Sequence, residues 1–350
     1  MNTTEAPKLG LLDRLERGPV ICAEGYLFEL ERRGFLQAGA FVPEVVLEHP
    51  EMVAQLHREF VHAGSDVVEA FTYYAHREKL RLIGKEELLE TINRQALGIA
   101  REVASESGAL LAGDICNTNV FTPDDAARRS VRAMFDEQVG WAVGAGVDFV
   151  IGETFAFAEE ALIATEAIKS AGLPAVVTLA VHQRPETREG WSPEEACKRL
   201  EDAGADVVGL NCIRGPQTIL PLLRTIRATV SGHLAALPVP YRTTEEQPSF
   251  QSLRDPEYDG LPDGRPFPTA LDPFTCNRYE IADFTRSALE LGVRYFGVCC
   301  GAAPHHIRSM AEALGRTPPA SRYTADMSKH AYLGTDESLK PEYREYAKEL

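Results

Sequence analysis

The chain has 350 residues, of which 44% are hydrophobic and 25% are charged, a composition typical of a globular protein with a sizeable core. Its formal net charge of −16 at pH 7 argues against nucleic acid or an anionic membrane surface as a partner. Residues 1–18 lack the basic and apolar regions of a signal peptide, and the apolar runs are too short for a membrane span. The 7 cysteines do not suggest a secreted disulfide framework. We therefore expect a cytoplasmic protein whose cysteines are available for metal binding or catalysis.

A repeated strand–helix pattern runs along the chain. Short, continuously apolar runs alternate with segments of helical periodicity, and in four places a Gly separates the end of a helix from a buried strand. The predicted strands lie within 19–22, 63–68, 109–113, 145–150, 175–181, 203–208, 234–239 and 291–296. The predicted helices are 50–60, 85–107, 130–145, 157–171, 193–203, 216–230 and 278–291. Eight such units predict an α/β fold, a single (β/α)₈ TIM barrel at residues 10–315.

Two segments interrupt this pattern. Residues 241–276 are rich in Pro, Asp, Gly and Arg, which predicts a long loop after the seventh strand. Residues 316–350 are polar and contain Pro, which predicts a C-terminal tail outside the barrel. An open doubly wound sheet is the alternative architecture, but the first strand is not followed by the Gly-x-Gly-x-x-Gly turn of a dinucleotide-binding fold.

Three cysteines follow predicted strands at the end of the barrel where enzymes of this fold keep their reactive groups. Cys212 follows the sixth strand, whereas Cys299 and Cys300 follow the eighth, with Gly301 available for the turn that two adjacent ligands need. Zinc accepts thiolate ligands, and a catalytic zinc site supplies three protein ligands and leaves a fourth position open. On spacing alone, a zinc site and a packing role both remain open for these three. The other cysteines are expected to be small buried side chains: Cys22, Cys116, Cys197 and Cys276.

At these residues the sequence resembles the homocysteine S-methyltransferase family, most closely its betaine-using members, over about residues 10–315. The resemblance is carried by Gly-Leu-Asn-Cys at 209–212, Leu-Gly-Val-Arg-Tyr at 291–295 and Gly-Val-Cys-Cys-Gly at 297–301, with support at 55–60, 71–75 and 304–308. It implies that Cys212, Cys299 and Cys300 bind Zn²⁺ as the cofactor. It further implies methyl transfer from betaine to the thiol of homocysteine, giving dimethylglycine and methionine, by a homo-oligomer, either a dimer or a tetramer.

The resemblance also assigns the substrate pockets. Glu153 matches a family glutamate that binds the amino group of homocysteine. The family's first strand ends in Asp-Gly-Gly or Asp-Gly-Ala, whereas this chain has Ala-Glu-Gly at 23–25, so we expect Glu24 to replace the aspartate beside Glu153. An aromatic cage suits a quaternary ammonium donor such as betaine. The positions that match the family's cage are Phe41, Tyr73 and Tyr74.

Three alternatives remain open at this point. The donor is a sulfonium compound, S-methylmethionine or a thetin such as dimethylsulfoniopropionate, because an aromatic cage accepts either cation. The acceptor is a thiol other than homocysteine, because the segment at 23–25 departs from the family pattern. The chain is a non-catalytic zinc protein that senses a ligand, an interpretation disfavoured by the three cysteines together with Glu153.

Overall fold

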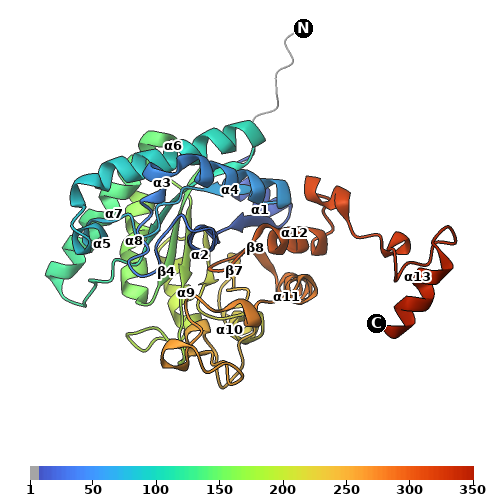
Figure 1. The fold of residues 1–350 in the computed structure, drawn as a ribbon. Coiled ribbons are helices and arrows are strands. Elements are labelled where there is room, and N and C mark those ends of the chain that lie inside the picture. The colour runs from blue at the N-terminus through green and yellow to red at the C-terminus, as the bar shows by residue number, and fades with distance from the viewer. Residues whose placement is uncertain (1–7) are drawn as a thin grey trace, which may run out of the picture.

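The computed structural model describes residues 8–350 and shows a closed parallel barrel surrounded by helices (Figure 1). The eight strands pair in chain order, and β8 pairs with β1 to close the barrel. The predicted (β/α)₈ fold is therefore confirmed, whereas the prediction about the N-terminal segment lies partly outside the described residues. The strands are β1 Val20–Ala23, β2 Val67–Glu69, β3 Leu110–Cys116, β4 Phe149–Phe155, β5 Ala175–Leu179, β6 Val207–Asn211, β7 His233–Leu237 and β8 Val293–Val298.

One long helix follows each strand and covers the outside of the barrel (Figure 1). These helices are α4 Pro50–Ala63, α6 Leu89–Ser107, α7 Asp125–Ala145, α8 Ala158–Ser170, α9 Pro193–Asp202, α10 Pro216–Arg227, α11 Arg278–Glu290 and α12 Pro304–Ala313. Shorter helices are α1 Leu11–Arg17, α2 Tyr26–Arg32, α3 Val45–Glu48, α5 Arg77–Leu82 and α13 Pro341–Tyr346.

The strands and helix ends form for reasons visible in the sequence. Nearly every strand residue is buried, since side chains point alternately into the barrel and toward the helices. The barrel interior is filled by a separate cluster that includes Phe149 and Tyr295, whose rings meet edge to face with centroids 6.4 Å apart. Ser192 caps α9 by accepting a hydrogen bond from the backbone N–H of Glu195. Gly64 ends α4 in the left-handed conformation, as the repeat predicted.

The structure differs from the sequence prediction mainly in the length of its elements. The helix predicted at 85–107 begins as a 3₁₀ turn at Glu86–Leu88, and α6 starts at Leu89. The short helices α1, α2 and α5 were not predicted, because six or seven residues carry too little periodicity to recognise. The fourth strand was predicted within 145–150, but β4 continues to Phe155 and includes Glu153, which pairs with Cys116 of β3. Polar residues within the ends of β3 and β4 therefore belong to the barrel mouth.

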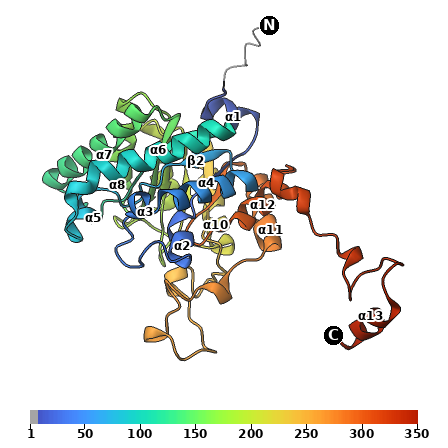
Figure 2. The same cartoon turned by 45° about the horizontal axis from the view of Figure 1, so that its top comes forward.

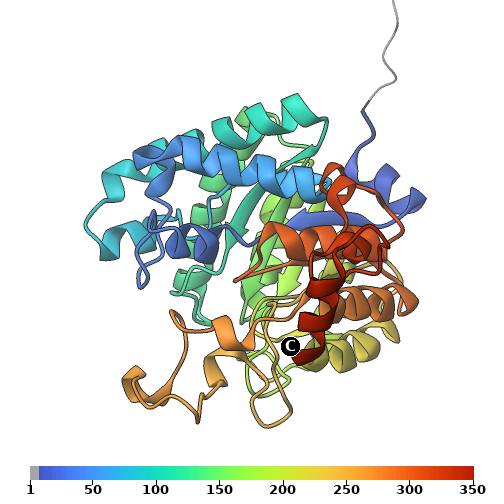
Figure 3. The same ribbon diagram turned by 45° about the vertical axis from the view of Figure 1, so that its right-hand side comes forward.

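The two irregular segments lie where the composition placed them. The loop after β7 contains three 3₁₀ turns, Phe250–Ser252, Pro262–Gly264 and Asp272–Phe274, and projects from the barrel in Figures 2 and 3, where it is orange. Beyond α12, a 3₁₀ segment at Pro319–Tyr323 contacts α4 and α12, and the chain then leads to α13, which stands apart from the barrel in Figures 1 and 2. The exact division into a barrel at 10–315 and a tail at 316–350 stays a prediction. In the described part of the chain, no helix combines the length and apolarity needed to cross a membrane.

Candidate active site

Three cysteines meet at the carboxyl end of the barrel. Cys212 directly follows β6, and Cys299 and Cys300 directly follow β8; their sulfur atoms all lie within 4.8 Å of one another. The backbone turns sharply at both places, with φ of 56° at Cys212 and 94° at Gly301. A Cβ at position 301 would come within 2.2 Å of the Tyr241 hydroxyl, so only glycine fits this turn. The turn explains how two adjacent side chains can face one point.

The three thiols form a polarised group. Hydrogen bonds from Cys299 and Cys300 hold the pKa of the Cys212 thiol well below its usual value, so Cys212 is the readiest of the three to ionise. Cys212 and Cys299 are buried and Cys300 is half-buried, and Cys299 and Cys300 border a cavity on one side of the group. Three soft sulfur ligands with an open side fit a catalytic zinc ion. The cysteine cluster can therefore hold a metal ion.

Four buried carboxyl groups line the cavity beside the cysteines. We call Glu24, Glu69, Asp114 and Glu153 the acid cluster; they come from the carboxyl ends of β1, β2, β3 and β4. Carboxylate oxygens of Glu69, Asp114 and Glu153 lie within 4.8 Å of one another, and the same limit holds for Glu24, Glu153 and the sulfur of Cys299. The acid cluster and the cysteines thus share one cavity, since Cys299 and Cys300 also line it.

Glu153 is held in place by the end of β6. The Asn211 side-chain amide donates to Glu153 Oε2 at 2.5 Å, and the Thr154 hydroxyl donates to the same oxygen at 3.0 Å. Asn211 is itself fixed, because its Oδ1 accepts the Thr154 backbone N–H at 2.9 Å. Burial, followed by the negative charge of Cys212, raises the pKa of Glu153 to about 8. Asn211, which directly precedes Cys212 in the sequence, therefore positions the glutamate beside the cysteines.

The other members of the acid cluster have oxygens without partners. Both carboxylate oxygens of Glu24, one of Glu69 and one of Asp114 are buried and accept no hydrogen bond. Burial and then the neighbouring carboxylates raise the pKa of each of these three groups well above its usual value. Glu24 was predicted at this site, whereas Glu69, the last residue of β2, was not among the predicted site residues. Asp114 was missed, although an acid inside the apolar run of β3 was the available signal.

Of the three aromatic residues predicted for a donor cage, the structure brings only Tyr73 to the cavity lining. The ring of Tyr74 lies 4.3 Å from that of Tyr73, but its face is covered by the Lys79 ammonium at 4.0 Å. Phe41 packs against Phe28 with centroids 5.8 Å apart. Tyr26 and Phe71, which were not predicted, also line the cavity. The substrate-binding roles of Phe41, Tyr73 and Tyr74 stay predictions.

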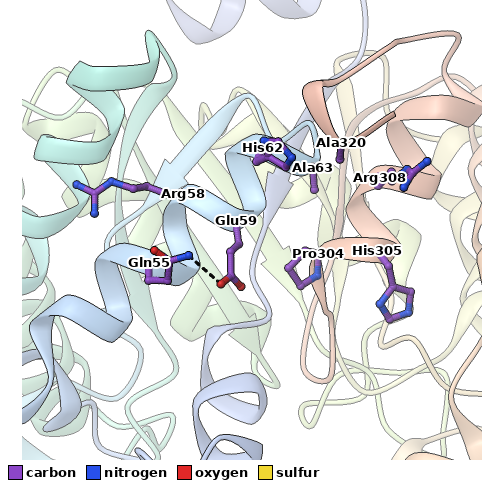
Figure 4. Close-up of a pocket in the computed structure, with 9 residues that line it drawn as sticks. All are labelled: Gln55, Arg58, Glu59, His62, Ala63, Pro304, His305, Arg308 and Ala320. Atoms are coloured by element: carbon purple, nitrogen blue, oxygen red, sulfur yellow. Dashed lines mark hydrogen bonds between the residues drawn. The ribbon is translucent and has the colours of Figure 1, made fainter. Parts of the chain in front are cut away.

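A separate hollow lies on the outside of the barrel between α4 and α12 (Figure 4). Gln55 and Glu59 of α4 form its one wall, joined by a hydrogen bond of 3.1 Å, and His305 and Arg308 of α12 form the other. It shares no lining residue with the cysteine cavity. The four remaining cysteines are buried, as predicted, and none lines either hollow.

Known proteins resemble this chain in fold or in sequence. The family model described as Homocysteine S-methyltransferase matches residues 23–314. Betaine–homocysteine S-methyltransferase 1 of Xenopus tropicalis is 38% identical over 328 residues, covering 90% of this chain and 78% of the relative. S-methylmethionine–homocysteine S-methyltransferase BHMT2 of Pongo abelii is 36% identical over 354 residues, covering 97% of this chain and 91% of the relative. The metallated homocysteine methyltransferase MmuM of Escherichia coli has the same fold, with a TM-score of 0.66 at 17% identity over 85% of this chain and 98% of that one. The chain belongs to the homocysteine S-methyltransferase family.

Proposed function

We propose that this protein transfers a methyl group from betaine to the thiol of homocysteine in a zinc-dependent reaction, giving dimethylglycine and methionine. The observation that carries the proposal is the set of three cysteine sulfurs within 4.8 Å of one another, next to a positioned glutamate. The names of the relatives, which cite homocysteine and either betaine or S-methylmethionine, support the same reaction.

The cysteines and Glu153 each have a task in this reaction. Zinc, when bound by Cys212, Cys299 and Cys300, keeps the acceptor sulfur as a thiolate at neutral pH. Glu153 accepts the ammonium group of homocysteine, and Asn211 fixes the carboxylate for that contact. The acceptor sulfur attacks the donor methyl carbon; a C–S bond forms, the C–N bond breaks, and the electron pair stays on the nitrogen of dimethylglycine. The protein contributes mainly positioning and exclusion of water from the buried cavity.

A sulfonium donor is the second candidate. An aromatic ring such as that of Tyr73, which lines the cavity, can attract a sulfonium as well as a quaternary ammonium. The relative from Pongo abelii, with a name that cites S-methylmethionine, covers nearly the whole chain. The protein environment at this ring therefore does not separate the two donor classes.

We also propose that the chain works in the cytoplasm as a homo-oligomer, acting on small molecules. All 7 cysteines are free in the structure, which suits a reducing compartment. The tail exposes a group of aromatic side chains, among them Tyr332, Tyr343 and Tyr346, that a second copy could cover.

The test is methionine formation from homocysteine by the zinc-loaded protein, with betaine, S-methylmethionine and dimethylsulfoniopropionate supplied separately. Turnover with betaine supports the full proposal, and turnover with a sulfonium alone changes the donor but keeps the mechanism. A protein that binds one zinc per chain and yet methylates no thiol with any donor would refute the proposed function and favour a sensor.

A further inference from the structure

A second cavity opens at the carboxyl end of the barrel, between the segment that follows β5 and the long loop that follows β7. Its volume is about 500 Å³, and it shares no lining residue with the cavity beside the cysteines. Ala156, directly after β4, and Ala180, directly after β5, belong to its lining, so it lies at the end of the barrel where enzymes of this fold bind substrates. We call it the basic pocket, because four guanidinium groups line it: those of Arg184, Arg188, Arg254 and Arg265.

Most of the positive charge in the basic pocket is not neutralised by the chain. The one carboxyl group in its lining, that of Glu186, lies 3.5 Å from Arg184. Among the described residues, Arg188, Arg254 and Arg265 form no ion pair with a carboxylate, and Arg254 donates only to backbone carbonyl groups of its own loop. This local excess of positive charge occurs in a chain whose formal net charge is −16. The basic pocket is therefore suited to an anion.

The walls of the basic pocket are bonded to the turn that carries Cys212. The backbone N–H of Phe250, in the loop after β7, donates to the carbonyl of Ile213 at 2.9 Å. The guanidinium of Arg214 donates to the backbone carbonyl groups of residues 181–183, in the segment after β5. The basic pocket therefore lies next to the turn of Cys212, while the cavity with the acid cluster lies beside the other two cysteines.

The candidate methyl donors share a second feature besides the onium centre. Betaine, S-methylmethionine and dimethylsulfoniopropionate each carry a carboxylate. The cavity with the acid cluster has no Lys, Arg or His in its lining, so a carboxylate there finds no cationic partner. Guanidinium groups, in contrast, bind carboxylates through charge-assisted and often bidentate hydrogen bonds. Of the two cavities, the basic pocket is the one that suits the anionic end of the donor.

We propose that the basic pocket binds the carboxylate of the methyl donor through Arg188, Arg254 and Arg265, with the onium methyl group directed toward the cysteine cluster. The inference rests on the proposed function, because it assumes that methyl transfer takes place at the cysteines. The ammonium group of homocysteine then lies at Glu153 and the carboxylate of the donor at the basic pocket, so the two substrates reach the cysteines from different cavities. Onium compounds that carry a carboxylate are the substrate class, and those without one are poor donors.

The first experiment compares donors that differ only in the carboxylate. Zinc-loaded protein with saturating homocysteine is given betaine or ethyltrimethylammonium, and dimethylsulfoniopropionate or dimethyl(propyl)sulfonium; in each pair a methyl group replaces the carboxylate. We expect kcat/KM of the active donor to fall about 10- to 100-fold when the carboxylate is replaced. Calorimetric titration with the same compounds should give the same order of affinity, so the preference can be judged even without turnover.

The second experiment removes the guanidinium groups one at a time. Arg188 and Arg265 are exposed, so Arg188→Gln and Arg265→Gln should fold normally, which urea unfolding checks. Each should raise the KM for the donor about 3- to 10-fold and leave the KM for homocysteine and the zinc content nearly unchanged. Neither variant should weaken binding of the carboxylate-free analogue further. Arg294→Gln, at an exposed position near the start of β8, is the matched control and should leave both KM values unchanged.

Two results would overturn the inference while leaving the proposed function intact. The first is a wild-type protein that binds and uses a carboxylate-free analogue as well as the corresponding donor. The second is a rise in the KM for homocysteine, and not for the donor, in Arg188→Gln and Arg265→Gln, which would assign the basic pocket to the carboxylate of the acceptor. Absence of methylation with every donor would instead refute the proposed function, and the calorimetric comparison would still decide whether the basic pocket selects a carboxylate.

Discussion

The two halves of the barrel mouth are built on different principles. On one side, the sulfur atoms of Cys212, Cys299 and Cys300 lie within 4.8 Å of one another, and sharp backbone turns set their positions. On the other side, Glu24 and Asp114 retain buried oxygens without partners. The first half is organised by the chain itself and can hold a metal ion, whereas the second half keeps buried hydrogen-bond acceptors that no group of the described chain satisfies. The comparison suggests that the cysteines set the chemistry and the acids set the substrate.

Removal of one cysteine tests the cysteine half of the barrel mouth and should have the largest effect on activity. In Cys212→Ala, two sulfur ligands remain, and the most acidic thiol of the cluster is gone. We expect bound zinc and methyl transfer to be lost together, measured by metal analysis and a product assay on the same sample. Cys197→Ala, a buried cysteine outside the cavity, is the control and should keep both. Stoichiometric zinc in Cys212→Ala would contradict the ligand assignment.

Glu153 lies where the two halves meet, and its replacement should have the next largest effect. Glu153→Gln keeps the contact with Asn211 but removes the charge that attracts an ammonium group. A charge-assisted hydrogen bond contributes about 1.5–3 kcal/mol, so kcat/KM for the acceptor should fall about 10- to 100-fold. Zinc content should be unchanged, and the KM for the donor should move much less. An equal loss for both substrates would show that Glu153 supports the whole site.

Replacement of Tyr73 tests whether binding of the methyl donor also depends on the barrel mouth. Because a cation–π contact contributes about 0.5–2 kcal/mol, Tyr73→Leu should raise the donor KM about 2- to 30-fold. Tyr74→Leu is the comparison, since the Lys79 ammonium already covers that ring, and it should change the donor KM less. A larger effect at Tyr74 would mean that Lys79 moves away when the donor binds.

The smallest expected effect is on stability, and it tests the acidic half alone. The pKa of Glu69 is raised above its usual 4.5 by burial and by Glu24, so the folded state binds this proton more tightly than the unfolded state. Its contribution to stability is therefore complete at pH below 4.5 and is lost as the pH rises toward the folded-state pKa. Glu69→Gln should remove that loss, so the free energy of unfolding of the metal-free variant should fall less than that of the metal-free wild type between pH 5 and pH 8. Urea unfolding of both proteins at pH 5 and pH 8 measures these free energies of unfolding. An identical pH dependence in wild type and Glu69→Gln would show that ionisation of the buried Glu69 does not destabilise the fold.

The sequence was informative where one residue type recurs at one structural position. The Gly-and-apolar repeat predicted the barrel because each copy ends a helix and starts a strand buried on both faces. Cys212 and Cys299 were recognised because they follow two of those strands. Asp114 was not recognised, because a single acid inside an apolar strand does not show which face it occupies. The covering of Tyr74 by Lys79 depends on the helix α5, which was too short to predict.

The sequence by itself determined the order of strands and helices, and therefore the end of the barrel at which the cysteines gather. Only the tertiary structure decided which side chains share the cavity. Barrel closure and strand register set the distances between residues from β1, β2, β3 and β4, although Glu24 and Glu153, for example, are 129 residues apart in the chain. Local patterns report burial and periodicity, but they contain no information about register between distant strands. The acid cluster is for this reason a property of the folded barrel.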